Sequence, residues 1–175
     1  MIGINCGSGQ RPFREGWINI DCQERWREAS DKAGGEFMLS KLIPLPFSDN
    51  SVPIVVAHHL LEHFDVADGE AFLREAYRVI RPGGELLVYT PNMEELCRRW
   101  LSREIGWVEF RTHTYGAYMG DEADRHKNCW GPEELLKTLW RTGSWLSIER
   151  AGNRIIRGAD IAGWAFWILD YRCVK

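Results

Sequence analysis

The chain has 175 residues, of which 45% are hydrophobic and 27% charged, and its formal net charge is −3. This composition is typical of one globular domain with a single core, and it offers no strongly basic surface for nucleic acid or an anionic membrane. No apolar stretch approaches the ~20 residues that span a bilayer. We therefore expect a single domain over residues 1–175, with neither a nucleic-acid nor a membrane partner.

The N-terminus and the cysteines predict the compartment. The chain begins MIGINCGSGQ, which lacks the basic start and the apolar stretch of a signal peptide. The five cysteines are an odd number and contain no C-x-x-C pair. This pattern fits a reducing compartment better than a disulfide framework or a cysteine zinc site. We expect a cytoplasmic location.

Short apolar runs predict strands in the first part of the chain. These runs are Ile2–Cys6, Trp17–Asp21, Glu36–Leu39 and Ser51–Ala57. Only ten residues, 7–16, separate the first two strands, and Pro12 is one of them. A parallel crossover normally needs a dozen or more residues. The first crossover helix is therefore expected to be shortened to about one turn.

The rest of the chain alternates helical patterns with strands. Gly69–Ile80 carries apolar side chains at helical spacing, and the sequence RPGG at 81–84 ends that helix. Further helices are predicted at Asn92–Arg103 and after Pro132, with a long loop at 106–131 between them. The remaining strands are expected at Glu85–Thr90, Trp145–Arg150 and Gly163–Val174. This order predicts an α/β domain whose mainly parallel sheet has an antiparallel edge strand at the C-terminal end of the chain.

The residues Asn5-Cys6-Gly7-Ser8-Gly9 form a candidate binding loop directly after the first strand. Glycine lets a backbone approach a ligand where a Cβ would collide, and open α/β sheets bind ligands beyond the carboxyl ends of their strands. Pro12 replaces the third glycine of a dinucleotide fingerprint, and no G-K-[ST] follows, which excludes a nucleotide P-loop. A tight turn without a ligand explains the loop alone equally well.

Asp21 ends the second predicted strand, WINID. A carboxylate at that position can accept hydrogen bonds from both hydroxyls of a ribose. Taken alone, Asp21 fits an ordinary turn or capping aspartate better. Beside the glycine loop, it favours a nucleoside cofactor.

Longer motifs give the chain a resemblance to a known family. In order, it carries INCGSGQ (4–10), GWINID (16–21), LPFSDNSV (45–52), HHLLEH (58–63) and LREAYRVIRPGGELLVYTPN (73–92). Over roughly residues 2–150, this succession resembles the class I S-adenosylmethionine (SAM)-dependent methyltransferases of the methyltransferase type 11 branch. The resemblance implies a Rossmann-like seven-stranded sheet and transfer of the SAM methyl group to an acceptor nucleophile.

The resemblance also implies roles for individual residues. The glycine loop would lie under the methionine part of SAM, and Asp21 would hold the ribose. Leu39 and Ser40, at the end of the third strand, would border the adenine. His59 would face the methyl group and the acceptor, as a candidate catalytic residue. The cofactor-binding residues implied in this way are Asn5, Cys6, Gly7, Ser8, Gly9, Asp21, Leu39, Ser40 and His58.

Three positions depart from the family pattern. Asn5 and Ser40 stand where relatives commonly carry acidic residues, and Pro53 stands where an aspartate is expected. Fewer carboxylates would then face the cationic cofactor. Two alternatives follow from the resemblance. The chain is either a methyltransferase acting on an O or N nucleophile of a small or medium acceptor, or a relative that binds SAM or S-adenosylhomocysteine (SAH) and serves as a partner subunit.

The segment His59-Leu60-Leu61-Glu62-His63 spells H-x-x-E-H, a pattern of zinc hydrolases. That function requires both histidines on one helix and a third ligand, such as Glu133 or Glu134. The strand predicted at Ser51–Ala57 runs directly into this segment, which places His59 at a strand end instead. We therefore expect the spelling to be coincidental and expect no metal ligands here.

The loop predicted at 106–131 is a candidate lid over the acceptor. Within it, His126 is the second candidate catalytic residue, because its pKa range suits removal of a proton from an attacking oxygen or nitrogen. A surface histidine is an equally good interpretation. The chain also has nine tryptophans, most of them expected in the core or in edge strands. A few exposed ones could form a homodimer contact or stack on a flat acceptor.

Overall fold

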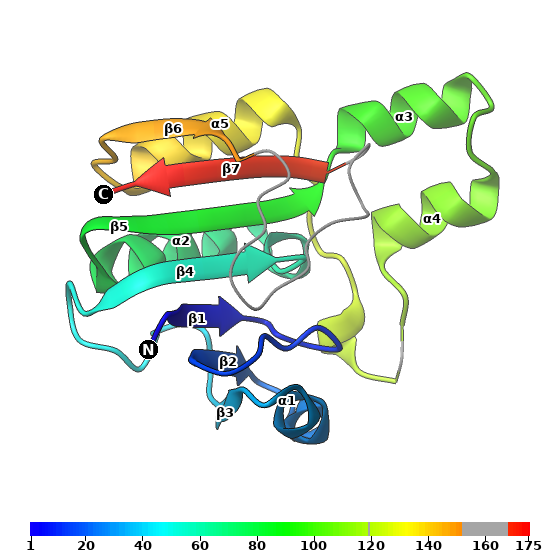
Figure 1. Ribbon diagram of the computed structural model, residues 1–175. Coiled ribbons are helices and arrows are strands. Elements are labelled where there is room, and N and C mark those ends of the chain that lie inside the picture. Colours follow the sequence, from blue (N-terminus) through cyan, green and yellow to red (C-terminus); the bar gives the residue numbers. More distant parts are fainter. Residues whose placement is uncertain (119, 152–167) are drawn as a thin grey trace.

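The predicted α/β fold is confirmed by a computed structural model, which describes residues 1–118, 120–151 and 168–175 (Figure 1). Seven strands form one sheet in the order β3-β2-β1-β4-β5-β7-β6. The first five strands run parallel to one another. The strands are β1 (Gly3–Cys6), β2 (Trp17–Asp21), β3 (Glu36–Leu39), β4 (Val52–His58), β5 (Ile80–Pro91), β6 (Ser147–Arg150) and β7 (Ile168–Val174).

The antiparallel strand predicted at the C-terminal end is confirmed. β7 runs antiparallel to both of its neighbours, β5 and β6, and Figure 1 shows its arrow pointing against the others. β7 lies next to the edge, and the short strand β6 forms the edge itself. Residues 163–167 of the predicted strand lie outside the described residues.

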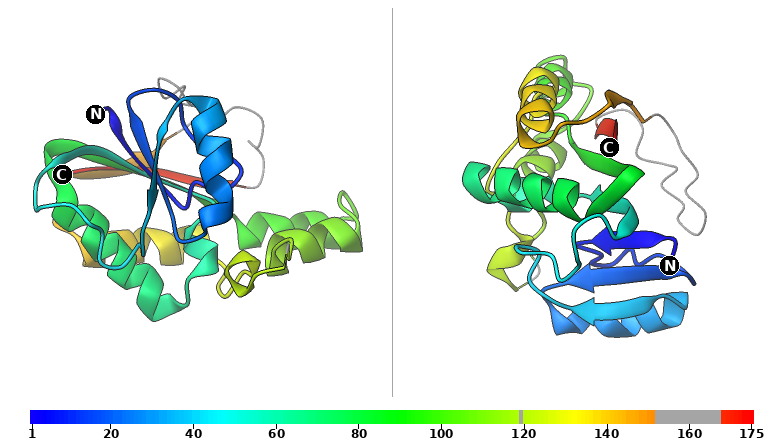
Figure 2. Two further views of the ribbon diagram at one scale, coloured as in Figure 1. Left: turned by 90° about the horizontal axis from the view of Figure 1, so that it is seen from below. Right: turned by 90° about the vertical axis from the view of Figure 1, so that its left-hand side faces the viewer.

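Two amphipathic helices, α2 (Val66–Val79) and α5 (Pro132–Thr142), pack side by side on one side of the sheet (Figure 2). α2 begins at its N-cap Asp65, whose side chain accepts a hydrogen bond from the Asp68 amide, and this cap starts the helix earlier than the apolar spacing predicted. Both helices bury leucines against the sheet, and those leucines belong to the main core cluster. No helix in the described ranges is long and apolar enough to cross a membrane.

The first crossover, residues 7–16, contains no helix, which corrects the expected single turn. Buried side chains hold it in place of helical hydrogen bonds. The Asn19 side chain accepts from the Phe13 amide (2.7 Å) and donates to the Phe13 carbonyl (2.9 Å) and to Ser30 Oγ (2.9 Å). Asn5 donates to Asn19 Oδ1 (3.0 Å) and to the Arg11 carbonyl (3.2 Å). The extended crossover therefore has a fixed path although it lacks regular structure.

Two α-helices and two 3-10 helices correct the prediction. A short 3-10 helix, η1 (Glu24–Trp26), leads into α1 (Arg27–Ala33) beside β3, where no helix was predicted. The stretch 106–131, predicted as a loop, contains α4 (Trp107–Tyr115) and the 3-10 helix η3 (Glu122–Asp124). α3 (Met93–Leu101) begins at Asn92, as predicted, and Figure 1 shows α3 and α4 extending beyond the carboxyl end of β5.

Candidate functional site

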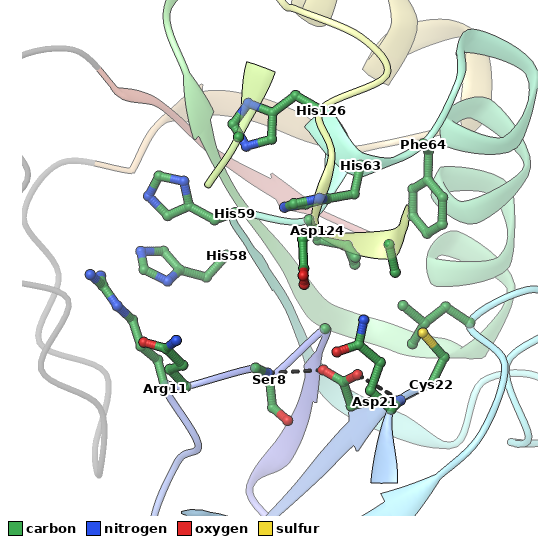
Figure 3. Close-up of a pocket in the computed structure, with 18 of the residues that line it drawn as sticks. Ser8, Arg11, Asp21, Cys22, His58, His59, His63, Phe64, Asp124 and His126 are labelled. Atoms are coloured by element: carbon green, nitrogen blue, oxygen red, sulfur yellow. Dashed lines mark hydrogen bonds between the residues drawn. The ribbon is translucent and has the colours of Figure 1, made fainter. Parts of the chain in front are cut away.

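A cavity of about 620 Å³ lies beyond the carboxyl ends of β1, β2 and β4. Its walls come from the loop after β1, the residues after β2, the segment after β4 and the chain between α4 and residue 127. Figure 3 shows Ser8 and Asp21 near one end of this space and His59 and His126 near the other. The volume is in the range of pockets that hold small-molecule ligands and cofactors.

The glycine loop bends tightly at the base of the cavity. Gly7 and Gly9 have φ values of +65° and +49°, which residues with a Cβ rarely adopt. The amides of Gly7 and Ser8 donate to the Ile20 carbonyl, at 2.8 and 3.2 Å, so the loop is fixed to β2. The Ser8 hydroxyl is buried, lines the cavity and has no hydrogen-bond partner among the described residues. A ligand in the cavity would satisfy this oxygen.

Asp21 lies where β2 opens into the cavity. Its carboxylate accepts from the Gly9 and Gln23 amides, each at 2.9 Å. Burial raises the pKa of Asp21 above its usual value, and these backbone hydrogen bonds oppose that shift. Each carboxylate oxygen retains a second lone pair for a ligand hydroxyl.

Six of the nine expected cofactor-binding residues line the cavity: Asn5, Gly7, Ser8, Gly9, Asp21 and His58. Cys6 is instead fully buried in the core. Leu39 is half exposed and Ser40 bonds locally to the Lys41 carbonyl, and neither lines the cavity. Leu42 and Trp26 provide the wall beyond Asp21.

Arg11 also lines the cavity, and the sequence patterns did not single it out. Figure 3 shows its guanidinium beside His58, across from the glycine loop. An arginine just after a glycine loop brings a cation to the wall of a site whose loop carries no charge of its own. Its position directly after the loop is the sequence feature from which Arg11 could have been predicted.

β4 ends at His58, and His59 follows it directly, at the opposite wall of the cavity. Burial lowers the pKa of His58 to about 3, and the positive fields of His59 and Arg11 act in the same direction, against that of Glu62. His58 is therefore a neutral imidazole at physiological pH, and its Nε2 has no hydrogen-bond partner among the described residues. His59 has a left-handed backbone (φ 52°), which is unusual outside glycine and turns the chain sharply after the strand.

Glu62 connects the histidines beneath the cavity. It is 1% exposed, its Oε1 accepts from His59 Nδ1 (2.9 Å), and its Oε2 accepts from the Thr90 hydroxyl (2.9 Å). Burial acts to raise the pKa of Glu62, but the hydrogen bond from His59 and the positive fields of His59, His63 and His126 outweigh it and lower the pKa to about 2. Glu62 is thus an ionised group that orients His59.

This geometry excludes a helical H-x-x-E-H zinc site. His59 lies in a bend after β4 with a left-handed backbone, and the 3-10 helix η2 begins only at Leu61 (Leu61–His63). The proposed third ligands, Glu133 and Glu134, are on α5, do not line the cavity, and pair with Lys137 and Arg141.

The segment predicted as a lid contributes to the cavity wall. Thr112, His113, Gly116, Asp124 and His126 line it. Asp124 forms an ion pair with Arg25 of η1 (2.6 Å), which joins the lid to the residues after β2. At the other end, the backbone amides of Lys127 and Asn128 donate to the Glu62 carbonyl.

Comparison with known proteins matches the part of the chain that contains the glycine loop, Asp21 and His58. The sequence family described as "Methyltransferase domain" matches residues 4–88, from β1 into β5. A probable S-adenosylmethionine-dependent methyltransferase of Mycolicibacterium smegmatis is 47% identical over 51 residues. That match covers 29% of this chain and 19% of the relative, so the matched part spans about a fifth of the relative's length.

Solved structures share the fold over nearly the whole chain. A SAM-dependent methyltransferase of Thermotoga maritima, described as a possible histamine N-methyltransferase, has a TM-score of 0.66 and 19% identity, covering 99% of this chain and 81% of that one. A putative methyltransferase solved in complex with the Haloferax volcanii Trm112 methyltransferase activator has a TM-score of 0.62 and 15% identity, covering 98% and 80%.

The sheet order, the cavity beyond the carboxyl ends of the strands, the family match and these relatives agree with the motifs read from the sequence. Residues 4–88 therefore match the methyltransferase domain family, and the fold is the one found in solved SAM-dependent methyltransferases, whose cofactor is S-adenosylmethionine.

Proposed function

We propose that the chain transfers a methyl group from SAM to an oxygen or nitrogen nucleophile of a small or medium acceptor. The observation that carries this proposal is the single cavity, which joins the glycine loop and Asp21 at one end to a group of histidines at the other. When bound, SAM supplies an electrophilic methyl group on a sulfonium sulfur. The chain's own residues then have two tasks, to orient the reacting atoms and to accept a proton.

The cofactor end fits a nucleoside with an amino-acid tail. Gly7, Ser8 and Gly9 would lie against the tail, with the unpartnered Ser8 hydroxyl as a hydrogen-bond donor, and Asp21 would accept from the ribose hydroxyls. Arg11 would bind the tail's carboxylate, because a guanidinium matches that group in charge and shape. The neutral His58 adds no positive charge beside a sulfonium.

The adenine is better placed against Leu42 and Trp26 than against Leu39 and Ser40. Leu42 and Trp26 line the cavity beyond Asp21 and offer apolar surface to a flat base, whereas Leu39 is 51% exposed and lies outside the cavity. We therefore exclude Leu39, Ser40 and the core residue Cys6 from the proposed site.

The three departures from the family pattern favour an active enzyme over an inactive relative. Asn5 holds the helix-free crossover through Asn19 and the Arg11 carbonyl. Ser40 and Pro53 lie away from the cavity. None of the three substitutions removes a group that the proposed chemistry uses.

His59 is the proposed proton acceptor at the acceptor end. Its Nδ1–H is held by Glu62, which leaves Nε2 as the basic nitrogen, and Thr90 fixes Glu62 in turn. A base oriented by a buried carboxylate is a recurring arrangement in proton-transfer sites. His126, also on the cavity wall, is the second candidate.

Calorimetry with SAM and SAH, followed by transfer of a labelled methyl group to a panel of phenols, amines, sugars and carboxylic acids, tests the proposal. We expect Asp21→Asn to weaken SAH binding about 10-fold. We expect His59→Gln to preserve SAH binding and to lower the transfer rate by a factor of about 10² to 10⁴.

Firm binding with no transfer to any acceptor would support the alternative, a binding relative that acts as a partner subunit. The activator-bound structural neighbour is a putative methyltransferase that forms a complex with a second protein. Failure of both ligands to bind at high micromolar concentration would refute the proposed cofactor site.

We also propose a cytoplasmic location, a single domain and a homodimer contact for the protein. All five cysteines are free thiols in the structure, which fits a cytoplasmic, reducing environment. A single domain over 1–175 agrees with the one continuous sheet. Trp100 and Trp107 on α3 and α4 are exposed and would serve a homodimer contact, which light scattering on the purified protein would detect.

A further inference from the structure

Three side chains with metal-binding atoms converge at the acceptor end of the cavity. Glu62 and His63 come from η2, and His126 comes from the lid, more than sixty residues later. One ligand atom from each lies within 4.8 Å of those of the other two. Figure 3 shows the rings of His63 and His126 close together, and their centroids are 4.9 Å apart. The group is assembled by the fold, because no local sequence pattern contains all three residues.

The hydrogen bonds of the two histidines fix which nitrogen is available. His63 Nδ1–H donates to the Arg125 carbonyl (3.2 Å), and His126 Nδ1–H donates to the His113 carbonyl (3.0 Å). Because a carbonyl only accepts, each ring presents the lone pair of its Nε2. Metal-binding histidines in proteins usually donate their other ring N–H to a carbonyl or carboxylate in this way.

The carboxylate is supported in the same manner. Glu62 accepts from the Thr90 hydroxyl through one oxygen and from His59 through the other. These bonds hold the carboxylate in one orientation, and each oxygen retains a lone pair. An ionised carboxylate that is buried without a permanently charged partner is stabilised electrostatically by a cation beside it.

We propose that Glu62, His63 and His126 bind one divalent transition-metal ion. Two imidazole nitrogens and one carboxylate oxygen form a common set of protein ligands for catalytic zinc, and such sites keep a further position open for water or substrate. Ligand atoms about 2 Å from a tetrahedral ion are roughly 3.3 Å apart. The three ligand atoms lie within 4.8 Å of one another, so they need to approach by at most about 1.5 Å to reach that spacing.

The chemistry of the donors selects the ion. Imidazole with carboxylate suits zinc, cobalt, manganese and iron, whereas magnesium prefers oxygen ligands alone. His63 and His126 line the cavity, so the open position of the metal faces the space left for the acceptor. If the proposed methyl transfer holds, an acceptor oxygen bound there would be more acidic, and His59 would be the base that removes its proton.

Metal titrations of the EDTA-treated full chain in the absence of SAM test the site. We expect one Zn²⁺ per chain by calorimetry, with a rise in melting temperature, and Co²⁺ binding with a visible spectrum that lacks thiolate charge-transfer bands. Mg²⁺ should bind more weakly than either ion. His63→Gln and His126→Gln should each weaken Zn²⁺ binding by at least ~100-fold.

His113→Gln is the matched control. It removes a histidine from the same cavity while keeping the backbone carbonyl that supports His126, so its Zn²⁺ affinity should stay within about 2-fold of the wild type. Circular dichroism of each variant confirms that it is folded, and the half-buried positions of His63 and His126 favour that result.

Three results would overturn the proposal. They are the absence of stoichiometric Zn²⁺ binding, equal affinity in all three variants, and a Co²⁺ spectrum that shows thiolate ligands and so points to Cys22 or Cys129. SAH binding, measured separately, is independent of this outcome, so loss of the metal site and loss of the cofactor site are distinguishable.

Discussion

Ser8 has a buried hydroxyl that the protein leaves without a partner among its described residues. Ser8→Ala should therefore hardly change stability, with a melting temperature within ~1 °C of the wild type. If the hydroxyl bonds to SAM, the same change should weaken SAH binding by about 3- to 10-fold, the equivalent of one hydrogen bond. Differential scanning calorimetry and titration calorimetry measure the two effects separately.

Ser30→Ala is the matched control with the opposite expectation. The Ser30 hydroxyl is buried, accepts from Asn19 Nδ2 (2.9 Å) and does not line the cavity. Its removal should lower the free energy of unfolding by about 1 to 2 kcal/mol without a change in SAH affinity. Unchanged SAH affinity in Ser8→Ala would remove Ser8 from the proposed site.

The site was predictable where a residue follows a strand directly. Gly7, Gly9, Asp21 and His58 end or follow predicted strands, and all four line the cavity. Leu39 was misplaced, because the side that a strand-end side chain faces depends on a pleat and register that propensity does not specify. The contact of His63 with His126 depends on the path of the lid, which the sequence pattern does not contain.

At the scale of the element, Arg78 connects α2 to the segment before β4, in addition to its ion pair with Glu75. Besides Glu75, its guanidinium donates to the carbonyls of Leu45 and Phe47 and to Asp49, so it clamps the segment before β4 to the helix. Arg78→Gln should lower the free energy of unfolding by about 2 to 3 kcal/mol, because two carbonyls and a carboxylate lose their donor. Urea denaturation measures the loss.

Arg74, one turn earlier on α2, is the matched control. Its side chain is 53% exposed and pairs with Glu70 on the solvent side. Arg74→Gln should change stability by less than about 0.5 kcal/mol. Equal effects of the two substitutions would show that the contacts with the segment 45–49 contribute nothing.

Helices were predictable where apolar spacing or a terminal residue marked them. α2 was found by its apolar spacing, and α3 and α5 were found by Asn92 and Pro132 at their starts. α1 buries only Ser30 and α4 buries none of its residues, so neither shows a pattern that distinguishes helix from loop. The absence of a normal helix in the first crossover was predictable from the length of the segment. The hydrogen bonds of Asn5 and Asn19 that hold the crossover instead are tertiary contacts, which the local sequence does not specify.

For the whole molecule, buried histidines make stability sensitive to mildly acidic pH. Burial lowers the pKa of His58 from 6.5 to about 3, and it also lowers those of His113 and His126. At a pH between the pKa of a histidine in the folded state and its pKa in the unfolded state, the unfolded chain binds more protons than the folded chain. The stability that these neutral histidines contribute is therefore full above pH ~6.5 and is lost as the pH falls below that value. Each histidine should contribute a slope of up to ~1.4 kcal/mol per pH unit.

Urea denaturation in EDTA between pH 7.5 and pH 5 measures this slope. His58→Gln removes the most strongly shifted group and should make the curve shallower. Carboxylates with lowered pKa values, such as Glu75, lose their contribution only below about pH 4.5 and do not affect this window. A flat wild-type curve from pH 7 to pH 5 would contradict the expected protonation states.

The overall sheet architecture was more predictable from the sequence than the individual helices or the site residues. Val- and Ile-rich runs identified β1, β2 and β4, and alternation with helices identified the parallel sheet. The insertion of β7 between β5 and β6 was less accessible, because strand neighbours are decided by long-range pairing rather than by local composition.

The lid is attached unequally at its two ends, and this bears on the order in which ligands leave. At the cofactor end it is joined to η1 by the Arg25–Asp124 ion pair, and at the other end backbone hydrogen bonds tie it to Glu62. Salt screens the first attachment more than the second. The lid should therefore open first over the cofactor. In the proposed reaction, SAH would then leave and SAM would enter while the acceptor stays bound. This order of release is suited to successive methylations of one acceptor molecule.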